Sequence, residues 1–266
     1  MSGRYRSNQH AVLVLLVLLG TLGVAQESRA AHFFDTAGIA DQAFGASFTA
    51  VPDLDGDGRD EIAIGVPGYN GGSGVTGAVF VWYGGRSLTA APDRIWTGVP
   101  GEQLGWAVAV VGDVSGDGRP DLGLGAPRYS QDGAAKGRVF VVYGTPDLPA
   151  SGPVASVADR VIVGEVGGDR FGYALAAAGD FDGDGDDDMI VGAPGSDKRA
   201  QQAGAAYVIY GGSGGPSADL AAATCFTGQV AGDGLGWSVT AAGNFLGGGA
   251  QSVAVGAPLN LSLIHI

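Results

Sequence analysis

One block recurs four times along this chain, and it fixes the architecture more tightly than any other feature. Each copy begins with a Gly that follows Phe or Leu and ends with a Pro. The glycines are Gly45, Gly105, Gly172 and Gly236, and the prolines are Pro67, Pro127, Pro194 and Pro258. Both series have spacings of 60, 67 and 64 residues, so length varies only between the blocks. A period of this kind indicates repeated supersecondary units that pack on one another.

The first three blocks contain the same acidic loop. Its copies are Asp53-Leu54-Asp55-Gly56-Asp57-Gly58, Asp113-Val114-Ser115-Gly116-Asp117-Gly118 and Asp180-Phe181-Asp182-Gly183-Asp184-Gly185. Oxygen donors at alternate positions, with glycines to turn the backbone, are what a hard cation such as Ca²⁺ needs from one short loop. The fourth block has no carboxylate between Asn244 and Ser252. We therefore expect the fourth unit to keep its strands and to lack the ion.

Short apolar runs in each unit predict β-strands. They are rich in Val, Ile and Ala and are bounded by Gly, Pro, Asp and Ser, while Gly alone contributes 50 residues. The expected strands are 106–111 and 173–178 in the first position, 62–66, 122–126 and 189–193 in the second, 78–83, 138–143 and 205–210 in the third, and 94–96, 160–163 and 224–227 in the fourth. Four antiparallel strands in about sixty residues are typical of a β-propeller blade. The predicted fold class is all-β.

The two ends of the chain differ from the repeats. Arg4 and Arg6 precede an apolar run at 11–22, and small residues follow, which predicts a secretory signal peptide at residues 1–30. The run is shorter than the roughly 20 residues of a membrane span. Residues 31–260 are expected to form blades, with repeats near 38–98, 99–164, 165–228 and 229–258. Residues 261–266 resemble translated sequencing-adapter read-through and are expected to be a non-native tail.

Charge and cysteine content exclude several classes of partner. The chain has 27 acidic and 14 basic residues, for a net charge of −13. Such a chain repels phosphate, so nucleic acid and anionic membrane surfaces are not expected as partners, and we expect no membrane insertion after signal cleavage. Cys225 is the only cysteine and cannot form an internal disulfide. Its apolar neighbourhood predicts a buried, inert thiol.

Two of the block boundaries carry a family resemblance. Phe44-Gly45 with Gly65-Val66-Pro67, and Phe171-Gly172 with Gly192-Ala193-Pro194, resemble the FG-GAP repeats of the integrin α-subunit N-terminal β-propeller and its bacterial relatives. The resemblance extends over residues 38–258. It implies four-stranded blades, and because the family's propeller usually has seven of them, it implies an incomplete fragment of a seven-bladed ring.

The resemblance also implies which atoms hold Ca²⁺. The family's nine-position loop places oxygen ligands at positions one, three, five and nine and a main-chain carbonyl at position seven. The matching residues are Asp53, Asp55, Asp57, Arg59 and Glu61 in the first loop, Asp113, Ser115, Asp117, Arg119 and Asp121 in the second, and Asp180, Asp182, Asp184, Asp186 and Asp188 in the third. Glu61 replaces the usual Asp, Ser115 is a neutral ligand, and the third loop matches best. Two to three bound ions are expected.

These loops allow two other interpretations. An EF-hand also begins Asp-x-Asp-x-Asp-Gly, but it needs a bidentate acidic residue at position twelve and flanking helices. Position twelve is Ile64, Leu124 or Val191, each on an expected strand, so the EF-hand is excluded. The loops could instead be solvated acidic turns, since Asp and Gly favour turns without any metal. That alternative stays open from the sequence.

By resemblance, the chain is expected to be a secreted, calcium-binding adhesion or interaction module, extracellular or in the cell envelope. Its ligand, a protein or a carbohydrate, would meet the polar loops at 69–76, 129–136 and 196–202. The alternatives are the non-catalytic propeller of a larger secreted hydrolase, such as a phospholipase, and a structural envelope component.

Catalysis by this chain is not expected. Its three histidines are His10, His32 and His265, in or near the expected signal peptide and in the suspect tail. Residues 211–215 fit Gly-x-Ser-x-Gly without the strand-to-helix context that the motif needs, and are expected to be a linker. Glu102, Asp169 and Asp233 recur two residues before the Leu-Gly or Phe-Gly step, which predicts a structural turn.

Overall fold

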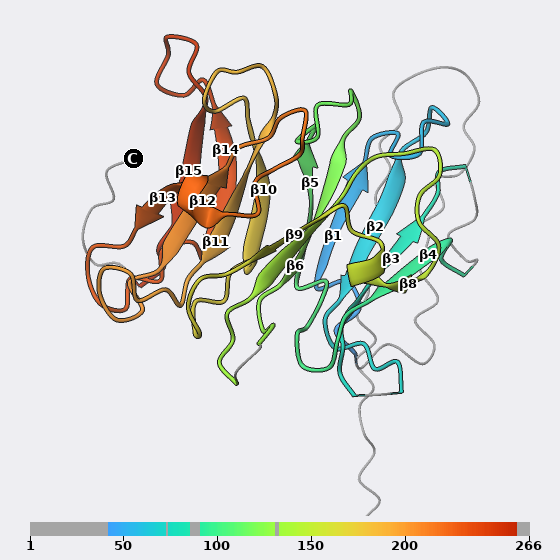
Figure 1. The fold of residues 1–266 in the computed structure, drawn as a ribbon, viewed down its shortest axis with the longest axis horizontal. Coiled ribbons are helices and arrows are strands. Elements are labelled where there is room, and N and C mark those ends of the chain that lie inside the picture. The colour runs from blue at the N-terminus through green and yellow to red at the C-terminus, as the bar shows by residue number, and fades with distance from the viewer. Residues whose placement is uncertain (1–41, 73, 86–90, 131–132, 260–266) are drawn as a thin grey trace, which may run out of the picture.

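The fold is a row of antiparallel sheets, one for each repeat (Figure 1). The computed structural model describes residues 42–72, 74–85, 91–130 and 133–259. The signal peptide predicted at 1–30 and the tail predicted at 261–266 lie outside these residues. Within the described part of the chain, no helix is both long and apolar enough to cross a membrane.

Three sheets have four antiparallel strands that follow one another in chain order. Blade 1 consists of β1 (Ser47–Val51), β2 (Glu61–Val66), β3 (Ala78–Trp82) and β4 (Arg94–Thr97). Blade 2 consists of β5 (Ala107–Gly112), β6 (Asp121–Ala126), β7 (Arg138–Val142) and β9 (Arg160–Val163). Blade 3 consists of β10 (Ala174–Gly179), β11 (Asp188–Ala193), β12 (Ala205–Ile209) and β13 (Thr224–Thr227). The fourth unit pairs β14 (Ser238–Gly243) with β15 (Ser252–Gly256).

The strands predicted from apolar runs are present in the structure, with ends that differ by one residue in most cases. The prediction of all-β, four-stranded antiparallel blades is therefore confirmed. The remaining regular elements are the two-residue β8 (Gly152–Pro153) and the short 3-10 helices η2 (Val154–Ser156) and η3 (Leu220–Ala222). The first strands β1, β5, β10 and β14 contact one another in succession, which places them on the inner side of the row.

Burial follows from the stacking of the blades. In blade 2, Phe140 and Val142 of β7 pack in a cluster with side chains of blade 1. The alternating residues Val139 and Val141 pack in a cluster with side chains of blade 3. Because successive side chains of a strand point to opposite faces, both faces of this sheet are covered. That explains why every residue of β6 and β7 is buried.

Glycines let neighbouring blades approach closely. In each block, the N–H of the Gly in the Leu-Gly or Phe-Gly step donates to the carbonyl oxygen of the Gly two residues before the block-ending Pro. In blade 2 this bond joins Gly105 N to Gly125 O at 3.1 Å. Across the blade boundary, a Cβ on Gly65 would lie 2.0 Å from Gly105 O, and one on Gly192 would lie 2.0 Å from Gly236 O. No side chain fits there, so the two glycines of the repeat motif meet as bare backbone from consecutive blades.

Replacing Gly192 with Ala should therefore destabilise the fold. The added methyl group would collide with a main-chain carbonyl that cannot move without shifting a whole blade, so we expect a loss of about 3 kcal/mol, the upper end for overpacking. Urea unfolding measures it. Gly152→Ala is the matched control, because a Cβ at Gly152 has no neighbour within 4 Å. Equal stability of the two variants would contradict the close packing.

The connection between β7 and β9 reaches back to the outer edge of blade 1, which the sequence did not predict (Figure 1). β8 within it pairs in parallel with β4. Ile95 N donates to Ser151 Oγ at 2.9 Å, and the indole of Trp96 donates to Pro149 O at 3.3 Å. Leu148 and Val154 of the same connection are buried. The open hydrogen-bonding edge of blade 1 is thereby covered by the following unit.

Cys225 lies on β13 and is half-buried, so the prediction of a buried thiol is wrong. The outer strand β13 leaves every one of its residues at least partly exposed. Burial still raises the pKa of the Cys225 thiol, although Lys198 lowers it in part. The thiol is therefore protonated at neutral pH, as expected for an unreactive cysteine.

Candidate metal-binding loops

The three acidic loops occupy the same place in their blades, between the first strand and the second. All three have positive φ at both glycines: Gly56 and Gly58 have φ of 80° and 85°, and Gly116, Gly118, Gly183 and Gly185 also have positive φ. Residues other than glycine rarely adopt this conformation, so the recurring glycines turn the backbone at the same two positions in each loop. Within each blade, the loop lies at the opposite end of the first strand from the Leu-Gly or Phe-Gly step.

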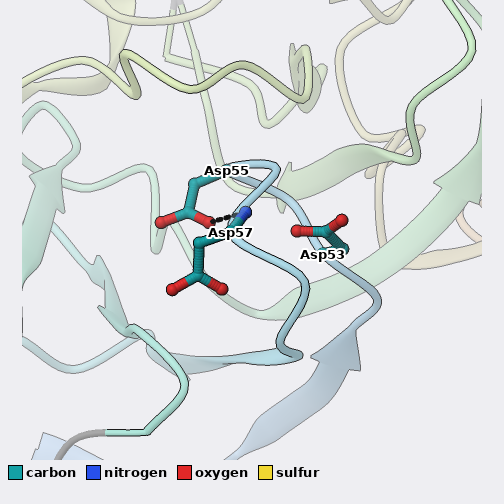
Figure 2. Close-up of side chains that lie close together, drawn as sticks. All are labelled: Asp53, Asp55 and Asp57. Atoms are coloured by element: carbon teal, nitrogen blue, oxygen red, sulfur yellow. Dashed lines mark hydrogen bonds between the residues drawn. The ribbon is translucent and has the colours of Figure 1, made fainter.

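The first loop brings three carboxylates together. Oxygens of Asp53, Asp55 and Asp57 all lie within 4.8 Å of one another. Figure 2 shows these side chains on one turn of the chain after β1, with the N–H of Asp57 donating to Asp55 Oδ1 at 3.1 Å. Asp53 Oδ1 accepts from Gly58 N at 2.8 Å. Arg59 Nη1 lies 3.1 Å from Asp57 Oδ2, and it offsets part of the negative charge.

The third loop forms a second cluster, in which oxygens of Asp180, Asp182 and Asp188 lie within 4.8 Å of one another. Asp184 lies outside this cluster, and its Oδ1 accepts from Asp186 N at 3.0 Å. The cluster therefore contains positions one, three and nine of the predicted ligand set. Asp184, at position five, belongs to the same loop but not to the cluster.

The second loop does not gather its carboxylates into such a cluster among the described residues. Ser115 Oγ donates to Asp113 Oδ1 at 3.3 Å, which brings positions one and three together. Asp113 Oδ1 also accepts from Asp117 N at 3.0 Å. Asp117 Oδ1 accepts from Arg119 N at 2.9 Å. The predicted carbonyl ligands, those of Arg59, Arg119 and Asp186, remain predictions.

The acidic residue at position nine has the same surroundings in all three loops. Glu61, Asp121 and Asp188 are fully buried. One carboxylate oxygen accepts a loop N–H, from Leu54 at 2.6 Å, Ser115 at 2.9 Å and Phe181 at 2.7 Å, respectively. The other accepts from the glycine after the third strand, Gly84 at 3.4 Å, Gly144 at 3.1 Å and Gly211 at 2.9 Å. This carboxylate ties the loop to the centre of its blade.

Burial governs the ionisation of these carboxyl groups. It raises the pKa of Glu61 and Asp188 above the usual range, against the backbone donors that lower it. It raises the pKa of Asp121 to about 7. A neighbouring cation favours the ionised form of a buried carboxyl group. The donors are all oxygens, so the residues present fit a hard cation such as Ca²⁺.

One contact that the sequence did not reveal joins two loops. Asp187, next to the position-nine Asp188, accepts through Oδ2 from Asp113 N at 3.0 Å. It comes from blade 3 and caps the end of the inner strand of blade 2. The sequence signal for it is the run Asp186-Asp187-Asp188, which has two more carboxylates than the pattern needs.

The fourth loop keeps a turn without carboxylates. Gly249 N donates to Asn244 Oδ1 at 3.2 Å, and β14 and β15 stay paired as expected. The side chains of Phe245 and Leu246 are 77% and 73% exposed. An apolar surface has replaced the acidic one at this end of the fourth unit.

Comparison with known proteins agrees with the repeat. Residues 44–82, 104–142 and 171–209 match the family model of the FG-GAP repeat. The chain is an FG-GAP repeat protein. It is similar to integrin α-subunits: integrin alpha pat-2 of Caenorhabditis elegans is 34% identical over 227 residues, covering 79% of this chain and 17% of the relative. Integrin alpha-PS2 of Drosophila melanogaster is 32% identical over 191 residues, covering 68% and 14%. The chain thus spans about a sixth of the length of these relatives.

The acidic residues before the FG step have a structural role in this FG-GAP protein, as predicted. Glu102 Oε1 accepts from Val99 N at 2.7 Å, and Asp169 Oδ2 accepts from Val166 N at 3.2 Å. Asp233 Oδ2 accepts from Val230 N at 2.8 Å. All three carboxyl groups are buried. Each closes the turn that leads into an inner strand.

Among the motifs considered for catalysis, the Gly-x-Ser-x-Gly match lies within the described residues. Residues 211–215 follow β12 as a loop, in which Gly215 N donates to Gly212 O at 2.7 Å, and no α-helix follows. The three histidines lie outside the described residues.

Proposed function

We propose that the chain is part of a secreted, calcium-stabilised interaction module that binds an extracellular protein or carbohydrate. The observation that supports this function is that the acidic loops and the loops before the inner strands lie at opposite ends of each blade. Two to three Ca²⁺ ions would stiffen one face. The other face would stay free for a partner.

The free face has an unusual surface, which we call the loop face. It consists of the connections from the second strand to the third and from the fourth strand to the next blade. Exposed apolar side chains recur there at equivalent positions: Val99, Val166 and Val230 are 44%, 54% and 53% exposed. Exposed apolar groups gathered on one face mark interaction surfaces. The described residues of the predicted ligand loops at 69–76, 129–136 and 196–202 lie on the same face.

Binding of extracellular polymers to the immobilised protein tests this function. With Ca²⁺ present, we expect at least one member of a panel of matrix proteins and polysaccharides to bind. Val99→Asp together with Val166→Asp should weaken that binding at least tenfold, because charge replaces the exposed apolar contacts. Phe245→Asp on the opposite face is the matched control. A panel member that binds equally to all variants would contradict the loop face as the site.

A further inference from the structure

Two adjoining cavities cross the loop face, and we call them together the furrow. The first, of about 280 Å³, lies between blades 2 and 3 and is lined by Gln103, Trp106, Pro127, Arg128, Arg170 and Tyr173. The second, of about 520 Å³, lies between blades 1 and 2 and shares Gln103 and Arg128 with the first. The small compartment has room for one ring-sized group. The shared residues make the whole long enough for a chain-like ligand.

Two arginines line the small compartment. Arg128 follows the block-ending Pro127, and Arg170 precedes Phe171, so they come from different blades. Both are exposed, and neither has an ion-pair partner among the described residues. In a chain of net charge −13, two unpaired cationic side chains in one cavity are a local excess of positive charge. Guanidinium groups hold carboxylates through paired hydrogen bonds.

The acidic residue that lines the larger compartment does not cancel this charge. Glu102 Oε2 accepts from Arg138 Nε at 2.7 Å, and its Oε1 accepts from Val99 N. Its carboxylate is buried and engaged within blade 2. An anion in the furrow would therefore meet the guanidinium groups rather than a free carboxylate.

Aromatic rings form one wall of the small compartment. The ring centroids of Trp106 and Tyr173 are 5.3 Å apart with an interplanar angle of 46°. Trp237 continues the row at 5.0 Å from Tyr173. The side chains of Trp106 and Trp237 are 36% and 46% exposed. Exposed rings with an apolar body and a polar tip suit ligands that are apolar on one face and polar at the rim, as sugar rings are.

The backbone beneath the furrow is strained at the residues that line it. Gln103 and Arg170 both have φ of 57°, a conformation that costs a residue with a side chain about 1–2 kcal/mol. Ala43, with φ of 58°, and Gly234 occupy the equivalent positions before the first and fourth inner strands, so this turn conformation recurs in every unit. Glycine is thus compatible with this turn, yet blades 2 and 3 place long polar side chains there.

We propose that the furrow binds a carboxylated carbohydrate chain, with uronate carboxylates on Arg128 and Arg170 and a sugar ring against Trp106 and Tyr173. This inference rests on the proposed function, because it names the ligand of the same loop face. The aromatic wall and the ring-sized compartment favour a carbohydrate over an acidic peptide.

Short oligogalacturonides are the probe, titrated calorimetrically into the whole protein in the presence of Ca²⁺. We expect binding that weakens as salt is added, about tenfold or greater loss for Arg128→Gln or Arg170→Gln, and no measurable binding for the double variant. Trp106→Ala should also bind weakly. Arg160→Gln, at the start of β9 and outside both the furrow and the loop face, removes the same charge and should bind like the unsubstituted protein.

The comparison probes decide between ligand classes. Methyl-esterified oligogalacturonides keep the rings and lose the charge, so equal binding would overturn the role of the arginines. Equal or tighter binding of polyglutamate would assign the furrow to an acidic peptide and overturn the carbohydrate. Absence of oligogalacturonide binding, in protein whose melting temperature still rises with Ca²⁺, would overturn the inference. If another polymer still binds through the loop face, the proposed function would survive that result.

Discussion

Chelation of calcium is expected to lower the free energy of unfolding by about 5–8 kcal/mol. A site held at about 100 times its dissociation constant contributes about 2.7 kcal/mol, and two or three such sites add up to this range. The physical reason lies in the clustered carboxylates of the first and third loops, which repel one another without a cation. Chemical unfolding in millimolar Ca²⁺ and in excess chelator measures the difference.

Single substitutions show whether the loops cause this effect. Asp182→Asn removes a carboxylate from the third-loop cluster and should cost one bound ion and about a third of the calcium-dependent stability. Asp147→Asn, at an exposed aspartate outside the three loops, should leave both unchanged. Mg²⁺ should substitute poorly, because it requires shorter octahedral geometry. A folded protein whose stability is the same with and without chelator would reduce the loops to acidic turns.

The second large effect is expected from Arg138→Ala. Arg138 and Glu102 form a buried ion pair, with 2.5 Å between Nη2 and Oε2, and the guanidinium lies 3.8 Å from the centroid of the Tyr129 ring and 4.5 Å from that of Phe140. Removing one partner leaves an uncompensated buried charge, which typically costs 3–5 kcal/mol. Urea unfolding at neutral pH measures this loss.

Two comparisons separate the ion pair from lost packing. Lys198→Ala breaks a partly exposed ion pair with Glu165 and should cost at most about 1 kcal/mol. Burial already raises the pKa of Glu102, and without Arg138 the folded-state pKa should rise further. The folded variant then binds a proton more readily than the unfolded chain, so its stability should increase as pH falls from 7 to 5. A variant with unchanged pH dependence would indicate that packing alone was lost.

The strands were predictable because their information is local. Val, Ile and aromatic runs such as 138–143 lie between glycines, and a strand needs little more than that pattern. The loop shape was predictable for the same reason, since Gly56 and Gly58 adopt φ values that other residues avoid. Because the same strand pattern and acidic loop recur at equivalent positions in three units, the family resemblance could be recognised from the sequence.

The contacts that the sequence did not reveal depend on which residues meet when the blades stack. Asp187 bonds to the backbone of Asp113, 74 positions earlier in the chain. Arg138 finds Glu102 at a separation of 36 positions, and no repeat pattern predicts the pair because blade 3 has Ala205 in place of the arginine. The furrow arises from side chains of several loops. Such contacts follow from the stacking of blades, which local propensity does not encode.

The covered edge of blade 1 has a consequence for synthesis on the ribosome. The strand β4 ends at Thr97, but the carbonyl that accepts from its side chain belongs to Gly152, 55 positions later. At about 5–20 residues per second, translation of that interval takes roughly 3–11 s. During this interval the nascent blade presents an unpaired strand edge. The earliest blade is thus open to chaperones, or to a neighbouring nascent chain, until the connection of the next blade has emerged.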